Sequence, residues 1–391
     1  MRYVKEFEAL RGVLAIWVVI GHVATASAVH GRLIEAKLYN VYAVTVFILL
    51  SGFAIAALID TKAEGYGLYI TRRALRIFPV YLFYLALSVL LVDFALTTWL
   101  DAPSGVMQAA RTTIAADTLA YWPWHLAAHL PALHGLVPPR LLPSTDYAFL
   151  GQAWSISLEW QYYLIAPFFI ALLTTRMTAI RIGLLLIGVV IVALILPRMP
   201  ESFIGRWLVD FTLGIATFYF MKYREKEGHP VRLIPVVKVW ALVLAGLVLQ
   251  RSASVLPYLI WATVIMLVIC AREKKGGVAA LFSRAANARP LQWVGNMAYS
   301  VYLSHMIVLI LMLQAVQAIG IKEPWSQFAV LVSATLVGAL VVSRISYVFI
   351  ELPFHRYGRN IGQSRQAVTA DRLTISPPAP SPVPTTRRNR R

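Results

Sequence analysis

The sequence predicts an all-α integral membrane protein whose helices cross the bilayer about ten times. Hydrophobic residues make up 59% of the 391 residues and charged residues only 14%, whereas soluble domains have about 25% charged residues. The mean hydropathy of +0.68 points the same way. The formal net charge is +18, but the basic residues lie between apolar segments, which favours membrane topology over nucleic-acid binding.

Ten segments are long and apolar enough to cross a hydrocarbon core that is about 30 Å thick. The fifth and the eighth of them are close to the minimum length for a span. The ten segments lie near residues 8–28, 40–60, 77–100, 154–174, 180–197, 203–221, 232–250, 254–271, 292–319 and 326–351.

The basic residues of the connecting segments predict that both termini are cytoplasmic. With the N-terminus inside, the inner connections carry more than twice as many Lys and Arg residues as the outer ones, even before the basic C-terminal residues are counted. No small-residue cleavage site follows the first apolar segment, so we expect a retained helix and not a signal peptide. The predicted location is the inner (plasma) membrane of the cell.

We expect one membrane domain, residues 1–356, followed by a disordered basic tail, residues 357–391. The tail ends in SPPAPSPVPTTRRNRR, a Pro-rich composition typical of segments without a packed core. Cys270 is the only cysteine, which excludes a disulfide framework and a cysteine-based metal site.

The longest outer connection, residues 101–153, contains three histidines in the sequence WPWHLAAHLPALH. His125 and His129 have the four-residue spacing of a pair of helical metal ligands, and His134 follows. No carboxylate or thiol stands beside them, so we expect no metal site. An amphipathic turn at the membrane surface is the alternative interpretation of this segment.

The first predicted helix carries two ionisable residues, Arg11 and His22, in the sequence EALRGVLAIWVVIGHVA. Eleven helical steps turn about 1100°, about 20° more than three full turns, so both side chains lie on one face. They are about 16.5 Å apart along the axis. Ionisable groups are costly in a bilayer, so the pair predicts a functional site if this face points into the bundle. The alternative is an arginine that reaches the lipid headgroups and a histidine that hydrogen-bonds to a neighbouring helix.

Three arginines begin the third predicted helix, in the sequence RRALRIFPVY. Arg72 and Arg76 share a face, and Arg73 pairs with Arg76 at a spacing of three. Guanidinium groups bind phosphates in a bidentate manner and stay charged, so the cluster predicts a phosphate site. Ordinary anchoring at the inner membrane surface is the alternative. The last predicted helix returns Glu351 to the same level, where we expect an ion pair with the cluster.

The fourth predicted helix begins with WSISLEWQYY, in which Ser155, Glu159 and Tyr163 share one face. A carboxylate inside a span must find a hydrogen-bond donor or take up a proton. Glu159 therefore either orients a catalytic histidine or pairs with a buried arginine such as Arg206 or Arg11.

The ninth predicted helix contains VGNMAYSVYLSH and places Tyr302 and His305 on one face. A lone histidine at mid-span more often belongs to packing than to catalysis. We therefore assign supporting roles to both residues, as we do to Ser155 and Glu351.

Six sequence motifs in this order resemble the membrane-bound acyltransferase-3 family, over residues 5 to 356. They are the helix from Arg11 to His22, FILLSGFAI at 47–55, RRALRIFPVY at 72–81, WSISLEWQYYL at 154–164, GNMAYSVYLSH at 295–305 and IELPF at 350–354. The resemblance implies an enzyme that moves acyl groups, usually acetyl, onto hydroxyls of sugars or glycolipids. It also implies catalytic roles for Arg11 and His22, and a site for the acyl-CoA donor at Arg72, Arg73 and Arg76.

The sequence departs from the family pattern at three positions. Ala298 stands where a serine is common, Trp160 stands where an acid is common, and Tyr162 replaces a usual phenylalanine. We expect these differences to affect acceptor specificity more than the reaction itself.

We hypothesise that His22 is the general base for an acceptor hydroxyl that attacks the thioester of acyl-CoA, with acetyl-CoA the expected donor. Glu159 would fix the tautomer of His22, as the carboxylate does in hydrolase triads. Arg11 would bind the donor or stabilise developing negative charge. A covalent acyl-histidine or acyl-serine intermediate is the alternative route. We expect acyl-CoA as a co-substrate, a sugar or glycolipid as acceptor, and no bound cofactor.

Two other functional classes fit ten membrane helices with buried charges. One is a transporter or a flippase of a lipid-linked sugar, although the sequence shows no internal repeat of the kind common in transporters. The other is an assembly subunit whose buried polar groups only hold helices together, which explains none of the ordered motifs.

Overall fold

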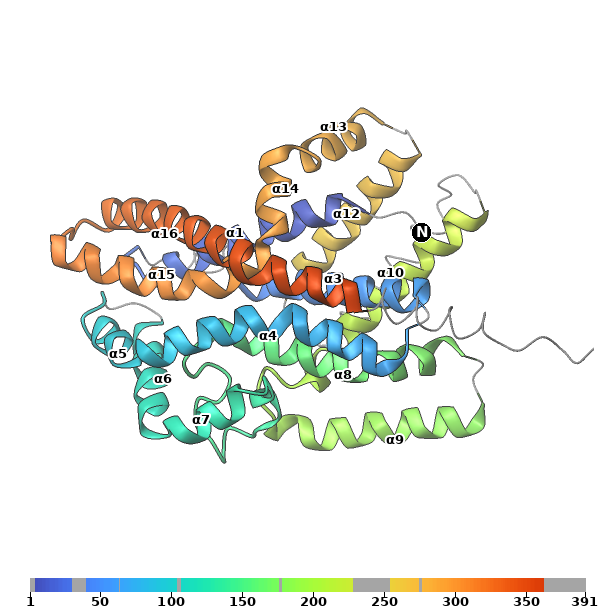
Figure 1. Ribbon diagram of the computed structural model, residues 1–391, viewed down its shortest axis with the longest axis horizontal. Coiled ribbons are helices and arrows are strands. Elements are labelled where there is room, and N and C mark those ends of the chain that lie inside the picture. Colours follow the sequence, from blue (N-terminus) through green and yellow to red (C-terminus); the bar gives the residue numbers. More distant parts are fainter. Residues whose placement is uncertain are drawn as a thin grey trace, which may run out of the picture.

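The computed structural model describes residues 4–29, 40–62, 64–103, 107–175, 178–227, 254–273 and 276–361, and within these ranges the protein is helical with no β-strand. The all-α prediction is thereby confirmed for the described part of the chain. The α-helices in Figure 1 are α1 (Glu6–Ala24), α3 (Asn40–Thr61), α4 (Tyr66–Leu90), α5 (Val92–Leu100), α6 (Gln108–Ala120), α7 (Trp122–His129), α8 (Trp154–Thr174), α9 (Ala179–Ile195), α10 (Leu208–Glu227), α12 (Leu256–Arg272), α13 (Gly277–Ala286), α14 (Arg289–Asn296), α15 (Ala298–Ile319) and α16 (Pro324–Ser346).

Six helices in the described ranges are long and apolar enough to cross a membrane. They are Glu6–Ala24, Asn40–Thr61, Tyr66–Leu90, Gly151–Thr174, Ala298–Ile319 and Pro324–Ile361. A seventh span is formed if α12 and α13, which meet at a bend of 103°, are counted together.

The predicted count of ten spans is not confirmed, and the reasons differ between segments. The predicted segment 232–250 lies outside the described residues. The predicted segment 180–197 forms α9, which has 17 residues, and 203–221 forms α10, whose last turns carry the charged sequence KYREKE. The orientation of the termini stays a prediction.

Two predicted spans have different boundaries in the structure. The segment expected at 77–100 begins earlier, at Tyr66, and breaks at Leu91 between α4 and α5, so the arginine cluster lies within a helix. The segment expected at 292–319 breaks at Met297 between α14 and α15. The last helix continues to Ile361, so the first residues of the predicted tail are helical, and residues 362–391 lie outside the described ranges.

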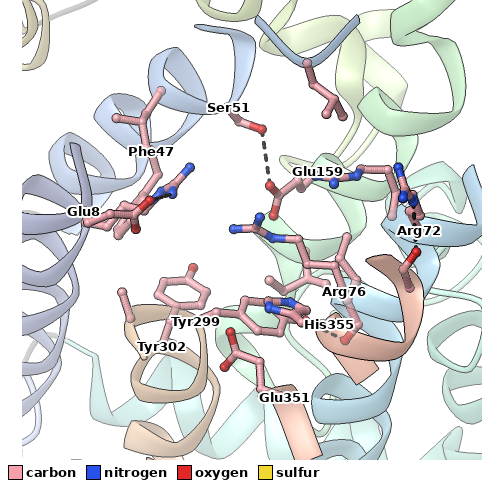
Figure 2. Close-up of a pocket in the computed structure, with 18 of the residues that line it drawn as sticks. Glu8, Phe47, Ser51, Arg72, Arg76, Glu159, Tyr299, Tyr302, Glu351 and His355 are labelled. Atoms are coloured by element: carbon pink, nitrogen blue, oxygen red, sulfur yellow. Dashed lines mark hydrogen bonds and ion pairs between the residues drawn. The ribbon is translucent and has the colours of Figure 1, made fainter. Parts of the chain in front are cut away.

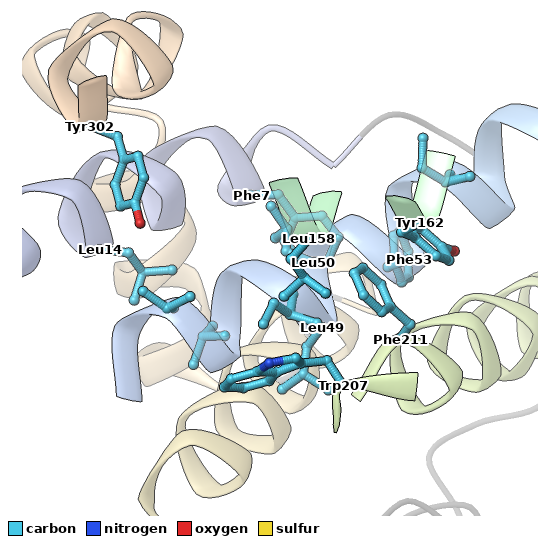
Figure 3. Packing of buried hydrophobic residues seen from close by; sticks show 14 of the residues in the cluster. Phe7, Leu14, Leu49, Leu50, Phe53, Leu158, Tyr162, Trp207, Phe211 and Tyr302 are labelled. Carbon is cyan, nitrogen blue, oxygen red and sulfur yellow. The ribbon is translucent and has the colours of Figure 1, made fainter. Parts of the chain in front are cut away.

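The core of the bundle lies where α3 packs along α10. Two glycines allow this close packing, because a Cβ atom on Gly214 would overlap the carbonyl oxygen of Leu49, and one on Gly52 would overlap that of Phe211. Small residues let membrane helices approach closely. Figure 3 shows Phe211 against Tyr162, whose rings stack at 3.8 Å between centroids.

The first helix is held against α14 by a second close approach. A Cβ atom on Gly295 would overlap the carbonyl oxygen of Glu8, and one on Gly12 would lie 2.9 Å from the backbone nitrogen of Gly295. The end of α14 therefore rests on α1 beside Arg11. This contact fixes the level of Arg11 relative to the later helices.

Helix α9 runs along the edge of the bundle, apart from its centre (Figure 1). Its apolar side chains face outward: Leu186, Val189 and Leu194 are each more than half exposed, at 62%, 64% and 65%. An exposed and continuous apolar surface of this kind suits contact with lipid chains.

The connection that we predict to be outer, residues 101–153, folds into α6, α7 and a short 3₁₀ turn, His134–Leu136. The three histidines of this segment are buried, and the rings of His129 and His134 stack at 3.9 Å. Burial lowers the pKa of His129 to about 3, so its ring is neutral at physiological pH. Trp122 and Trp124 on the same helix are exposed, which favours the amphipathic interpretation. The described residues contain no group of three or more His, Cys, Asp or Glu side chains that could hold a metal ion.

Candidate active site

Among the described helices, two neighbouring cavities contain the ionisable residues of α1. The first, which we call the arginine pocket, has a volume of about 520 Å³ and is lined by α1, α3, α4, α8, α10, α14, α15 and the last helical turns between Tyr347 and Arg359. The second, which we call the histidine pocket, has a volume of about 480 Å³ and is lined by α1, α3 to α6, α15 and the segment that leads into α8. The defining residues are Arg11, Arg72, Arg73 and Arg76 for the arginine pocket, and His22 and Arg111 for the histidine pocket.

The three arginines of α4 line the arginine pocket together, but their surroundings differ. Arg72 pairs with Glu64 and donates to the backbone carbonyl oxygens of Gly358 and Arg359, both at 2.9 Å. Arg73 lies over the ring of Tyr163 at 5.7 Å, and its Nε is buried without a partner. Arg72 therefore ties α4 to the last helix.

Arg76 lies deeper in the same pocket. Figure 2 shows it among the carboxylates of Glu159 and Glu351, with Tyr299 nearby. The two carboxylates attract the guanidinium group of Arg76 electrostatically. The arginine pocket thus combines several cations with acidic groups that balance them.

Glu159 belongs to this pocket and not to the surroundings of His22. Its carboxylate accepts hydrogen bonds from Ser51, at 3.2 Å, and from the Tyr163 hydroxyl. The structure thus does not bring Glu159 to His22, and it also does not pair Glu159 with Arg206, which donates to backbone carbonyl oxygens.

Glu351 lies in a π-helical turn, Tyr347–Glu351, that continues α16. A π-turn re-aims side chains and is frequent at functional sites. Glu351 is buried and accepts a hydrogen bond from Ser300 at 2.6 Å. It lines the same pocket as the arginines of α4. The ion pair expected between Glu351 and this cluster is not formed among the described residues, where Arg72 pairs with Glu64.

The two ionisable residues of α1 occupy different cavities. Arg11 lines the arginine pocket and forms an ion pair with Glu8 at 2.9 Å. His22 lines the histidine pocket, where its ring lies 5.2 Å from that of His305. The helix therefore places one ionisable residue in each cavity. This agrees with the helical rise, which separates Arg11 and His22 by about three turns along the axis.

Arg111 is a component of the histidine pocket that sequence reasoning missed. Its Nη2 donates to the Thr25 hydroxyl at 2.8 Å and lies 3.5 Å from Nδ1 of His22. Its guanidinium group also lies over the ring of Trp99, at 4.6 Å from the centroid. From the sequence, Arg111 was one of several basic residues in outer connections, and only the fold of α6 brings it to His22.

Tyr302 and Val44 line both cavities, so the cavities share a wall. The Tyr302 hydroxyl makes a hydrogen bond with Ser155 at 2.7 Å and donates to the Gln152 carbonyl oxygen at 3.1 Å. Ser155 lines the arginine pocket and Gln152 lines the histidine pocket. Ser155 and Tyr302, both predicted from the sequence as supporting residues, thus lie where the cavities meet.

Residues 4–344 match the family model Acyl_transf_3, described as an acyltransferase domain. The chain belongs to the acyltransferase-3 family. No curated protein and no solved structure matches it. Family membership and the apolar helices together make the chain a membrane acyltransferase. The alternatives of a transporter or an assembly subunit are not favoured.

Proposed function

We propose that the protein transfers an acyl group, with acetyl the expected group, from acyl-CoA to a hydroxyl of a sugar in a polysaccharide, lipopolysaccharide or other glycolipid. The observation that carries the proposal is the pair of cavities that share the wall at Tyr302. One cavity has arginines suited to binding a phosphorylated donor, and the other has a histidine suited to activating a hydroxyl.

The donor end belongs to the arginine pocket. Acyl-CoA carries several phosphates, and arginine binds phosphates through charge-assisted, bidentate hydrogen bonds. Arg73 and Arg76 line this cavity, and Arg73 has a buried Nε without a partner. The predicted topology places this pocket toward the cytoplasm, where acyl-CoA is found, so the donor enters from that side.

The transfer step belongs to the histidine pocket. The pantetheine arm of the donor is long and narrow, and it would carry the thioester past Tyr302 toward His22. His22 then removes the proton from the acceptor hydroxyl, which suits a side chain whose ordinary pKa is near neutral. Glu159 lies in the other cavity, so in this proposal it balances and positions the arginines and does not orient His22.

The experiment follows two labels on the donor. Membranes that contain the protein are incubated with acetyl-CoA labelled either on the acetyl group or on the CoA, together with glycolipid and polysaccharide extracts. Acetyl label, but not CoA label, should appear in the extract and be released by mild alkali, as expected for an ester. Membranes without the protein are the control. Absence of transferred label with every extract, or transfer of both labels together, would overturn the proposal.

A further inference from the structure

The histidine pocket contains a buried positive charge that the proposed mechanism has not used. Arg111 is buried, with 8% of the residue exposed. Burial lowers the pKa of Arg111 to about 10, so the guanidinium group still carries its charge at neutral pH. Within the described part of the chain, no carboxylate forms an ion pair with Arg111, and no acidic residue lines this pocket.

The hydrogen-bond donors of Arg111 divide into two sets. Nη2 is engaged by the Thr25 hydroxyl and lies 3.4 Å from the carbonyl oxygen of His22. Nη1 is buried and has no partner. A buried donor without an acceptor costs free energy, and the cost is greater when the group is charged. An unpaired cationic donor in a largely apolar pocket therefore points to an anionic oxygen that occupies the position during function.

The position of this donor relative to His22 shows which oxygen fits. Nη2 lies 3.5 Å from Nδ1 of His22, and Nη1 is bonded to the same guanidinium carbon, so both nitrogens lie near the proposed base. An arginine N–H can only donate, and its contact with Nδ1 favours the tautomer in which Nδ1 holds the lone pair. The acceptor hydroxyl and the thioester carbonyl must meet within hydrogen-bond reach of both groups.

We propose that Arg111 stabilises the oxyanion formed when the acceptor hydroxyl attacks the thioester. The inference rests on the proposed acyl transfer. The hydroxyl oxygen forms a bond to the carbonyl carbon, its proton passes to the lone pair on Nδ1 of His22, and the carbonyl electron pair moves to the oxygen that faces Nη1 of Arg111. Collapse of this intermediate breaks the carbon–sulfur bond. The CoA thiolate leaves and takes the proton back from His22, which leaves an ester and free CoA.

The surroundings of Arg111 suit this role. Trp99 covers one face of the guanidinium group and Thr25 fixes one of its nitrogens, so the donor is held in place before the reaction. Preorganised donors in a site that excludes water stabilise developing charge far more than they would in bulk water.

The test compares Arg111→Gln and Arg111→Ala with the wild-type enzyme in the labelled-acetyl assay. We expect kcat to fall about 10²- to 10³-fold, the typical loss for one oxyanion donor, while the Michaelis constants for acetyl-CoA and acceptor stay within about threefold. Added guanidinium ion should restore part of the activity of Arg111→Ala, whereas the same concentration of sodium chloride should not.

Two further variants separate catalysis from structure. Thr25→Ala removes the hydrogen bond that ties Arg111 to α1 but keeps the charge, so it should lose much less activity than Arg111→Gln. Arg140→Gln changes an exposed arginine of the same outer connection and should behave like wild type. Thermal unfolding in detergent shows whether each variant is folded.

Three results would overturn the proposal. The first is a fall in activity that is equal in Thr25→Ala and Arg111→Gln and that guanidinium does not rescue, which would make Arg111 only a link between helices. The second is an unchanged kcat with a raised Michaelis constant for the acceptor, which would make Arg111 a binding group for an anionic acceptor. The third is unchanged kinetics. Failure of acyl transfer itself would appear already in the wild-type enzyme.

Discussion

The arginine pocket and the histidine pocket both contain arginine, but they differ in the acidic groups that surround it. In the arginine pocket, cations lie close to acidic groups: Arg11 pairs with Glu8, and Arg72 pairs with Glu64. In the histidine pocket, the only arginine among the lining residues is Arg111, and the described lining includes no acidic residue. Trp99 and other apolar side chains surround it.

In the proposed reaction, this difference separates donor binding from chemistry. In a pocket with both charges, acidic groups hold the arginines in place while no donor is bound. When a donor binds, its phosphates can replace some of the contacts between the arginines and these acidic groups. A mostly apolar pocket strengthens every remaining electrostatic interaction, because little water screens it. The lone cation and His22 are therefore best placed to act on charge that appears only during the reaction.

The largest effect is expected from removing the proposed base. His22→Ala should lower kcat by about 10²- to 10⁴-fold, the usual contribution of a general acid–base group, while the protein still inserts into the membrane. His305 supplies a matched control, since its ring lies 5.2 Å away in the same region and its Nε2 is buried without a partner. We expect His305→Gln to lose less than about tenfold in kcat, a range below that of a general base.

The measurement is the rate of transfer of labelled acetyl groups, normalised to the amount of folded protein in the membrane. If His22→Ala retained wild-type activity, His22 would lose its role. If His305→Gln lost as much as His22→Ala, the assignment of the base to His22 would have to be abandoned in favour of His305.

An effect of intermediate size is expected in the arginine pocket. Removing Arg72 and Arg76 together should raise the Michaelis constant for acetyl-CoA by about ten- to a hundredfold. Arg72 is already engaged by Glu64, so we expect a net loss equal to about one hydrogen bond to a charged group, about 1.5–3 kcal/mol. The value of kcat at saturating donor should change little, since these residues lie in the other cavity from His22.

Lys222→Ala is the matched control for this experiment. Lys222 pairs with Asp60 at 2.6 Å on the exposed surface and lies outside both cavities, so its loss should leave the kinetics unchanged. If the Michaelis constant for acetyl-CoA were unchanged in the double arginine variant, the arginines of α4 would only anchor the helix at the membrane surface.

The sequence predicted those parts of the site that depend on one helix at a time. Helical periodicity and rise put Arg11 and His22 at two depths of one helix, and put the arginines of α4 together. The all-α architecture followed from composition and from the length of the apolar segments. These features need no knowledge of which helices are neighbours.

The parts that the sequence could not predict depend on contacts between helices. Glu159 and Ser155 share a face of α8, yet Glu159 reaches Ser51 of α3 while Ser155 reaches Tyr302 of α15. The role expected for Glu159 beside His22 was therefore not found in the structure. Arg111 could not be placed because the path of the outer connection, which folds back over His22, has no periodic signal.

The smallest effect is expected from Glu159→Gln, and it tests directly to which cavity this residue belongs. The amide oxygen of glutamine can still accept the hydrogen bonds of Ser51 and Tyr163, but the negative charge beside the arginines is lost. The Michaelis constant for acetyl-CoA should therefore fall by a few-fold, roughly a change of less than 1.4 kcal/mol, because the pocket becomes more attractive to phosphates.

A carboxylate that oriented His22 would behave differently, since an amide in that position of a hydrolase triad lowers kcat about 10⁴-fold. Steady-state kinetics at saturating acceptor distinguish the two cases: a kcat within about fivefold of wild type assigns Glu159 to the donor pocket, and a fall toward the His22→Ala value would assign it to the catalytic step.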